Sequence, residues 1–187
     1  MTLQLQRLRL SISQYNKMID AGILTENDKV ELINGEIIQM SPIGHKHITT
    51  VNRLNMLFAS QFAPEAIVSI QNPVQLGTYN EPEPDVVLIK GPFKRYKNRK
   101  PALEDVFVII EVADSSLRFD REIKASMYAK ENVPMYWIVN VEEDTVEVYT
   151  QPTPTGYIQC ELSTVNDKID ISGLGQPVWV KDFLGEL

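Results

Sequence analysis

The chain has little of three things: cysteine, long apolar runs and positive charge. Its 187 residues include one cysteine, Cys160, which excludes an internal disulfide. No apolar run exceeds five residues, as in 106–110, whereas a membrane-spanning helix needs about 20. The first ten residues contain arginine and no apolar core, so we expect no signal peptide. These absences favour a cytoplasmic protein without a membrane segment.

The shortage of positive charge limits how the protein can bind nucleic acid. With 25 acidic and 18 basic side chains, the formal net charge is −7. This charge excludes a coating of nucleic acid by bulk positive charge, but it leaves a local binding site possible. The composition is ordinary for a globular protein. The length fits one domain, so we expect residues 1–187 to fold as a single domain.

Hydrophobic periodicity predicts both helices and strands. Apolar residues at helical spacing predict helices over 13–21, 47–62 and 120–131. Short β-rich runs bounded by turn residues predict strands over 30–33, 36–40, 66–71, 74–77, 85–89, 106–112, 136–141, 145–150 and 157–162. Asn34-Gly35 suits a type I′ turn and predicts a hairpin between the first two strands.

Two of these strands, at 86–89 and 106–110, are continuously apolar rather than alternating. This pattern is typical of central strands that are covered on both faces. The predicted fold class is therefore α/β, bordering on α+β, with a mixed central sheet flanked by helices.

The common phosphate-binding and nucleophile signatures are absent, and what remains is a set of acids and one lysine. Asp85 directly precedes an apolar strand and is either a solvated acid at a strand entrance or a site residue. Glu111 ends five apolar residues and is followed by Val112 and Ala113. Burial of an unpaired carboxylate is costly, so Glu111 needs a partner, a metal or an exposed strand end.

Lys124 and Glu31 also have two interpretations. Lys124 lies four residues after Asp120 in a predicted helix, which fits an exposed ion pair. If that helix folds back on the strand that carries Glu111, Lys124 reaches the same cleft instead. Glu31, in the first hairpin strand, is either an acid at the rim or a further carboxylate of that cleft. A cleft that holds several carboxylates and a lysine suits phosphodiester hydrolysis. Mg²⁺ prefers a few carboxylates plus water, and a lysine can orient the attacking water.

Several short motifs follow one another along most of the chain. They are Glu31 to Glu36, Ser41-Pro42 with His47, Pro84-Asp85, Glu111-Val112 with Ser115, Asp120, Lys124 and Tyr128, Val133-Pro134, and Tyr136 to Val139. Their order and spacing resemble the Uma-two family of endonucleases, in the PD-(D/E)XK, restriction-endonuclease-like superfamily. The resemblance runs from about Tyr15 to Thr150.

This resemblance implies a restriction-endonuclease-like core and cleavage of DNA that depends on Mg²⁺ or Mn²⁺. It implies that Asp85 and Glu111 are metal ligands and that Glu31 completes the metal site. Lys124 corresponds to a catalytic lysine that has moved from the strand into the following helix. Cleavage of both strands of a duplex usually calls for two active sites, so the fold also implies a homodimer.

Two positions depart from the pattern, and two others are secondary candidates. Ala113 stands where the strict superfamily motif has its lysine, and Met135 stands where the family usually has glutamate. His47 matches a histidine of the family pattern but shares a helix face with apolar residues, which favours a core or helix-start role. Tyr128 follows Lys124 by one helical turn and is expected at the site or beside the lysine.

Residues 90–100 carry six positive charges, two aromatic residues and no acid. They connect the strands of Asp85 and Glu111, and they form either a solvated loop or a phosphate-binding arm beside the cleavage site. The candidate nucleic-acid-binding residues are Lys94, Arg95, Lys97, Arg99 and Lys100.

Two other functions stay open at this point. One is a non-catalytic interaction or regulatory module that keeps the fold. The other is a hydrolase that acts on sugars through paired carboxylates, which requires a carboxylate separation of about 5–10 Å. The second alternative leaves the lysine and the basic segment unexplained.

Overall fold

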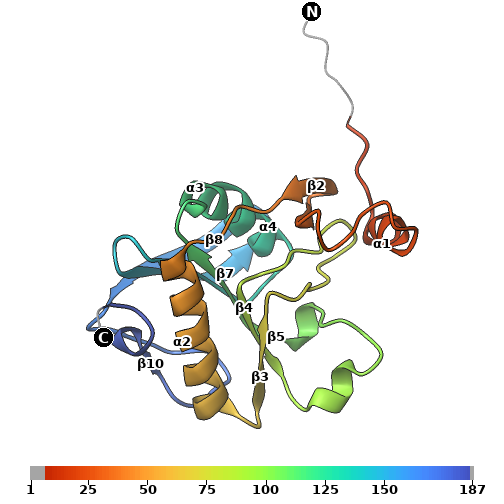
Figure 1. Ribbon diagram of the computed structural model, residues 1–187. Helices are drawn as coiled ribbons and strands as arrows, with labels where there is room; N and C mark the ends of the chain where they lie inside the picture. The colour runs from red at the N-terminus through yellow and green to blue at the C-terminus, as the bar shows by residue number, and fades with distance from the viewer. Residues whose placement is uncertain (1–6, 186–187) are drawn as a thin grey trace, which may run out of the picture.

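A six-stranded mixed sheet forms the centre of the computed structural model, which describes residues 7–185 (Figure 1). The strands lie side by side in the order β3-β4-β5-β6-β7-β8. Their bounds are β3 (Ala66–Ile70), β4 (Val86–Lys90), β5 (Val106–Ala113), β6 (Met135–Asn140), β7 (Thr145–Thr153) and β8 (Gly156–Thr164). Within this sheet β5 and β6 are parallel, and the other neighbouring pairs are antiparallel. The predicted mixed α/β fold is therefore confirmed.

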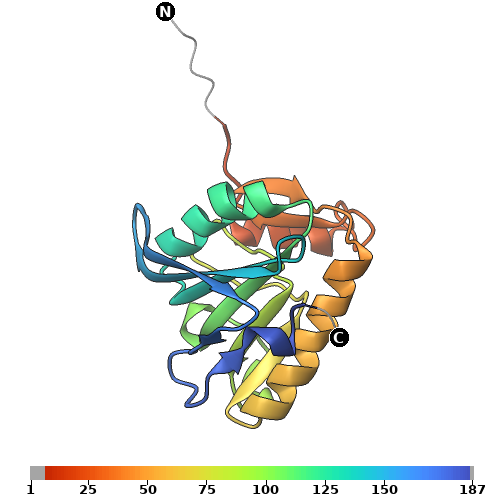
Figure 2. The same ribbon diagram turned by 90° about the vertical axis from the view of Figure 1, so that its left-hand side faces the viewer.

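Helices cover both faces of the sheet (Figure 2). They are α2 (His45–Phe62) on one face and, on the other, a continuous helix made of α3 (Leu117–Phe119), a π-helical turn η3 (Asp120–Lys124) and α4 (Ala125–Lys130). Phe58 of α2 meets Trp137 of β6 edge-on, with ring centroids 6.2 Å apart. On the opposite face Tyr128 packs against Tyr136, with centroids 4.8 Å apart. Aromatic residues of β6 thus anchor both helical layers.

The remaining elements extend these two layers. They are α1 (Ile12–Asp20), β1 (Val30–Ile33), β2 (Glu36–Gln39), η1 (Phe93–Tyr96), η2 (Leu103–Asp105), β9 (Lys168–Ile169), β10 (Val178–Trp179) and η4 (Val180–Asp182). The β1–β2 hairpin buries Ile33 in the core beneath α4. The C-terminal segment buries Phe183 in the core beneath α2. No helix within residues 7–185 has the length and apolar character needed to cross a membrane.

Local sequence signals agree with the structure in some places and differ in others. The Asn34-Gly35 turn is confirmed, since both residues have positive φ angles, 53° and 79°. The strand predicted at 74–77 is wrong: Gln75 and Leu76 form only isolated bridges, because Gly77 turns the chain with a φ of 59°. The helix predicted from 120 begins at Leu117 instead.

Candidate active site

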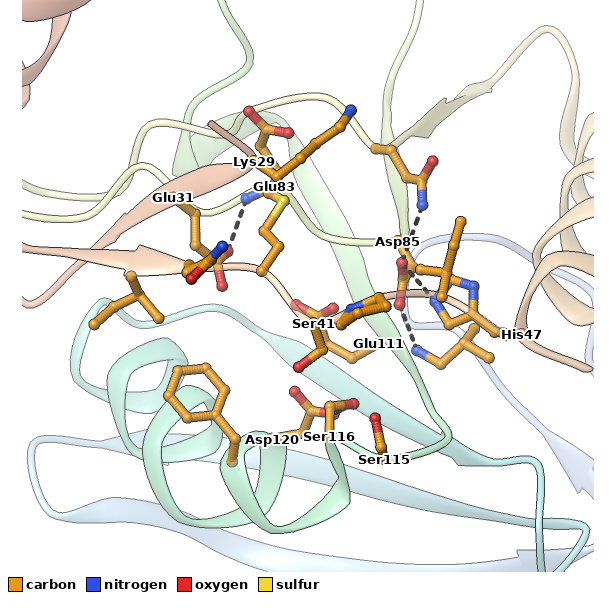
Figure 3. A pocket seen from close by; sticks show the side chains of 18 of the residues that line it. Lys29, Glu31, Ser41, His47, Glu83, Asp85, Glu111, Ser115, Ser116 and Asp120 are labelled. Atoms are coloured by element: carbon orange, nitrogen blue, oxygen red, sulfur yellow. Dashed lines mark hydrogen bonds and ion pairs between the residues drawn. The ribbon is translucent and has the colours of Figure 1, made fainter. Parts of the chain in front are cut away.

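A pocket of about 760 Å³ opens at one end of the sheet (Figure 3). Asp85 immediately precedes β4, and Glu111 lies near the end of β5. Because the two strands are antiparallel neighbours, with Val86 opposite Ile110, the start of one lies beside the end of the other. The β1–β2 hairpin, the start of α2 and the helix around η3 complete the walls. The pocket therefore collects side chains from segments far apart in the sequence.

Lys124 forms ion pairs with two acids that line this pocket. Its Nζ lies 3.0 Å from Glu111 Oε1 and 3.2 Å from Glu31 Oε1. The hydroxyl of Tyr128 donates to the same Glu111 oxygen at 2.8 Å. All four side chains are buried. The helix that carries Lys124 does fold back on the strand that carries Glu111, and Lys124 is not an exposed surface lysine.

Asp85 is held by donors on both of its oxygens. The backbone N–H of Val112 donates to Oδ2 at 2.8 Å, and His47 Nε2 lies 2.9 Å from Oδ1. The other ring nitrogen of His47 is buried and has no hydrogen-bond partner among the described residues. His47 thus lines the pocket and contacts Asp85 directly, rather than packing only with apolar residues of its helix face.

Acidic side chains outnumber lysines in the lining of the pocket. Burial raises the pKa of Glu111 to about 8, and Asp85, Asp120 and Glu31 contribute to this rise against the opposing effect of Lys124. Burial alone lowers the pKa of Lys124, but Glu111, Glu31 and Asp120 outweigh burial and raise it. The ammonium group of Lys124 therefore interacts with several carboxylates at once.

The sequence reasoning missed Asp120 and Glu83 as pocket residues. One of the two interpretations of Lys124 pairs it with an exposed Asp120, but Asp120 is 2% exposed and accepts a hydrogen bond from Ser116 Oγ at 2.6 Å. Its pKa is raised to about 6, chiefly by burial. The Glu83 backbone N–H donates to Glu31 Oε2 at 3.1 Å. The signal that could have found Asp120 is its place between Ser116 and Lys124, one helical turn from each.

The chemistry of these donors fits Mg²⁺ or Mn²⁺. Within residues 7–185, no three His, Cys, Asp or Glu side chains form a preformed set of metal ligands. Mg²⁺ does not need such a set, because it is usually held by one or two carboxylates together with water and substrate phosphates. The clustered carboxylates supply the hard oxygen ligands that this ion prefers.

The basic segment 90–100 lies elsewhere. It leaves the end of β4 and leads to the start of β5, whereas Asp85 and Glu111 lie at the opposite ends of these strands. The expectation that it lies beside the site is wrong, because a connection between antiparallel neighbours lies at one end of the pair only. No residue of the segment lines the pocket.

Several cations of this segment pair with acids. Arg99 donates to both oxygens of Asp105, at 2.6 and 2.9 Å, and Arg95 Nε lies 3.5 Å from Asp105 Oδ1. Lys100 Nζ lies 2.6 Å from Glu81 Oε1. Lys94 and Lys97 are exposed, and among residues 7–185 neither has an ion-pair partner. Their contact with nucleic acid stays a prediction.

The layered fold, with Asp85 before the start of β4 and Glu111 near the end of β5, defines a protein with a restriction-endonuclease-like core. A family model described as "Putative restriction endonuclease" matches residues 12–178, so the chain belongs to the Uma2 family, as its sequence predicts. Among solved structures it is similar to a "putative nuclease belonging to DUF820" from Anabaena variabilis ATCC 29413. That similarity has a TM-score of 0.71 at 18% identity and covers 93% of this chain and 97% of the other. A search of the curated proteins gave no match.

Proposed function

We propose that the protein is an endodeoxyribonuclease that hydrolyses phosphodiester bonds of DNA with Mg²⁺ or Mn²⁺. The observation that carries this proposal is the convergence of Glu31, Asp85 and Glu111 with Lys124 in one pocket. Membership of the Uma2 family and the fold shared with a protein described as a nuclease support the same reaction class.

In this proposal Asp85 and Glu111 would hold the metal ion, with Glu31 as a further ligand. The chemistry that the ion would supply when bound is Lewis-acid activation of the phosphate and of a water molecule. Lys124, which stays protonated beside the acids, orients the attacking water and balances the charge that develops on the phosphate. Tyr128 and His47 fix the orientations of Glu111 and Asp85, respectively.

Lys124 also separates this proposal from glycoside hydrolysis. A buried lysine within 3.0 Å of a carboxylate has no part in a two-carboxylate mechanism. In phosphodiester cleavage it stands beside the anion that is being cleaved. Membership of a family described as restriction endonucleases favours DNA as the substrate. A homodimer is the proposed assembly, since two sites serve two strands.

The test is plasmid cleavage by the purified protein with Mg²⁺ or Mn²⁺, with and without EDTA. We expect nicking or linearisation that EDTA abolishes and that Glu111→Gln lacks. Asp105→Asn is the matched control, because it neutralises a buried acid at the other end of the sheet. If the wild type does not cut with either metal, or Glu111→Gln cuts as fast as the wild type, the proposal is wrong and a non-catalytic module becomes the better interpretation.

A further inference from the structure

The last strand of the central sheet, β8, has an open outer edge. Within residues 7–185, β8 is hydrogen-bonded to a single neighbouring strand, β7, and ends the sheet. Proteins usually protect such an edge with charged side chains, above all lysine, with proline or with a short strand. β8 is nine residues long, contains neither lysine nor proline, and has Glu161 as its one charged residue. The opposite edge strand, β3, has five residues. The edge of β8 is thus available for pairing.

Side chains on this edge are also unusually exposed for a strand of a central sheet. Ile158 is 68% exposed and Leu162 is 65% exposed. Gln159, Cys160 and Glu161 between them are exposed too. Two large aliphatic side chains on an open edge are costly to leave in water, because removing apolar surface from water is favourable. The strand therefore favours a partner that covers it.

The residue pattern of β8 identifies that partner as a second copy of the same strand. Cys160 is the middle residue of the strand, so a fully overlapped antiparallel pair of two copies has its twofold axis there. Ile158 then lies opposite Leu162 of the other copy, and Gln159 lies opposite Glu161, each pair occurring twice. Apolar residues face apolar residues and no like charges face each other, which are the pairings that stabilise antiparallel strands.

We propose that two copies of this chain associate through antiparallel pairing of their β8 strands, about a twofold axis at Cys160, so that the two sheets join edge to edge. Such an interface is isologous, because the same surface serves on both subunits. No residue of β8 lines the candidate active site, so both pockets stay uncovered. The proposal concerns assembly alone and does not depend on whether the protein cleaves DNA.

The proposal is tested by sedimentation of the full chain over a range of concentrations, under reducing conditions. We expect a monomer–dimer equilibrium for the wild type. Gln159→Glu places a new carboxylate opposite Glu161 of the other copy, twice in each dimer, and should raise the dissociation constant roughly tenfold. Adding Glu161→Lys to that variant converts both repulsive pairs into opposite charges and should restore the dimer. Both side chains are exposed on the strand, so neither substitution should disturb the fold of the monomer.

Cys160 gives an independent readout, since it is the single cysteine of the chain. Mild oxidation with copper phenanthroline should yield a covalent dimer on a non-reducing gel. Cys160→Ser should lose the covalent dimer but still sediment as a dimer. A wild type that stays monomeric at all concentrations overturns the proposal. A dimer that is insensitive to Gln159→Glu and is not linked by oxidation also overturns it, because it must use another surface.

Discussion

The two ends of the β4–β5 pair each bury a carboxylate beside a cation, yet the two acids are affected in opposite ways. Asp105, at the basic end, receives two hydrogen bonds from Arg99 and one from the Ala102 N–H, and these interactions lower its pKa. Glu111, at the pocket end, has its pKa raised to about 8 by burial and by neighbouring acids. An ion pair whose donors match its acceptors stabilises the fold. A buried carboxyl group whose pKa is strongly raised in a cleft is instead a candidate functional group.

Removing the cation at each end should give the largest contrast. Lys124→Gln is expected to lower the rate of plasmid cleavage by at least about 100-fold, because the developing charge on the phosphate loses its positive neighbour. Arg99→Gln removes the cation at the other end and should leave the cleavage rate of the folded protein unchanged. The measurement is the initial nicking rate at a fixed Mg²⁺ concentration. Equal losses in both variants would show that Lys124 acts through folding rather than through the reaction.

Neutralising the two buried acids should affect stability to different degrees. Asp105→Asn loses charge-assisted hydrogen bonds and is expected to lower the free energy of unfolding by about 2 kcal/mol. Glu111→Gln relieves a carboxylate that resists ionisation and should not lower stability near neutral pH. Urea denaturation followed by circular dichroism checks both. A large loss of stability in Glu111→Gln would mean that Glu111 mainly holds the fold together.

The raised pKa values of the pocket acids should make the stability of the protein depend on pH. The Glu111 pKa is raised from 4.5 to about 8, so in this range the folded state holds a proton that the unfolded state has released. The free energy of unfolding of the metal-free protein should therefore fall as the pH rises from about 4.5 to about 8. Asp120, raised from 3.8 to about 6, adds to the fall at lower pH. Denaturation in EDTA across this range should show a flatter profile for Glu111→Gln, and an identical profile would contradict the assignment.

The smallest effect is expected from the exposed lysines of the basic segment. Replacing Lys94 and Lys97 together by alanine removes two cations far from the pocket along the strands, so DNA affinity should fall by less than about threefold at moderate salt. Fluorescence anisotropy with a labelled duplex measures this. A larger loss, together with a weaker salt dependence, would establish the segment as a DNA-binding arm despite its distance from the pocket.

Features that depend on a few neighbouring residues could be predicted from the sequence. The Asn34-Gly35 turn, the long helix α2 and the buried strands β4 and β5 follow from local turn chemistry and apolar spacing. The candidate site residues follow from the order of short motifs, and the structure brings Glu31, Asp85, Glu111 and Lys124 into one pocket. Their roles in catalysis stay predictions.

Features that depend on strand direction or helix register could not be predicted in this way. The basic segment was placed at the wrong end because apolar runs indicate that 86–89 and 106–110 are strands but not that they run in opposite directions. The burial of Asp120 could not be predicted, because helical spacing shows which residues share a face but not that this face packs on the sheet. The π turn between Asp120 and Lys124, in which the Ala125 N–H donates to the Asp120 carbonyl, has no signal in the apolar spacing either.

The π turn is the place in this helix where a change of length disturbs least. Because the Ala125 N–H bonds to the carbonyl five residues back, at Asp120, the turn holds one residue more than a turn of α-helix. Deleting one residue between Asp120 and Lys124 would let the turn close as a regular α-helix, with these two residues three positions apart and still on the same face. The same deletion in α4 would rotate the chain before it by about 100° and turn Lys124 away from Glu111. The helix should therefore tolerate a shorter chain at the π turn far better than in its regular turns.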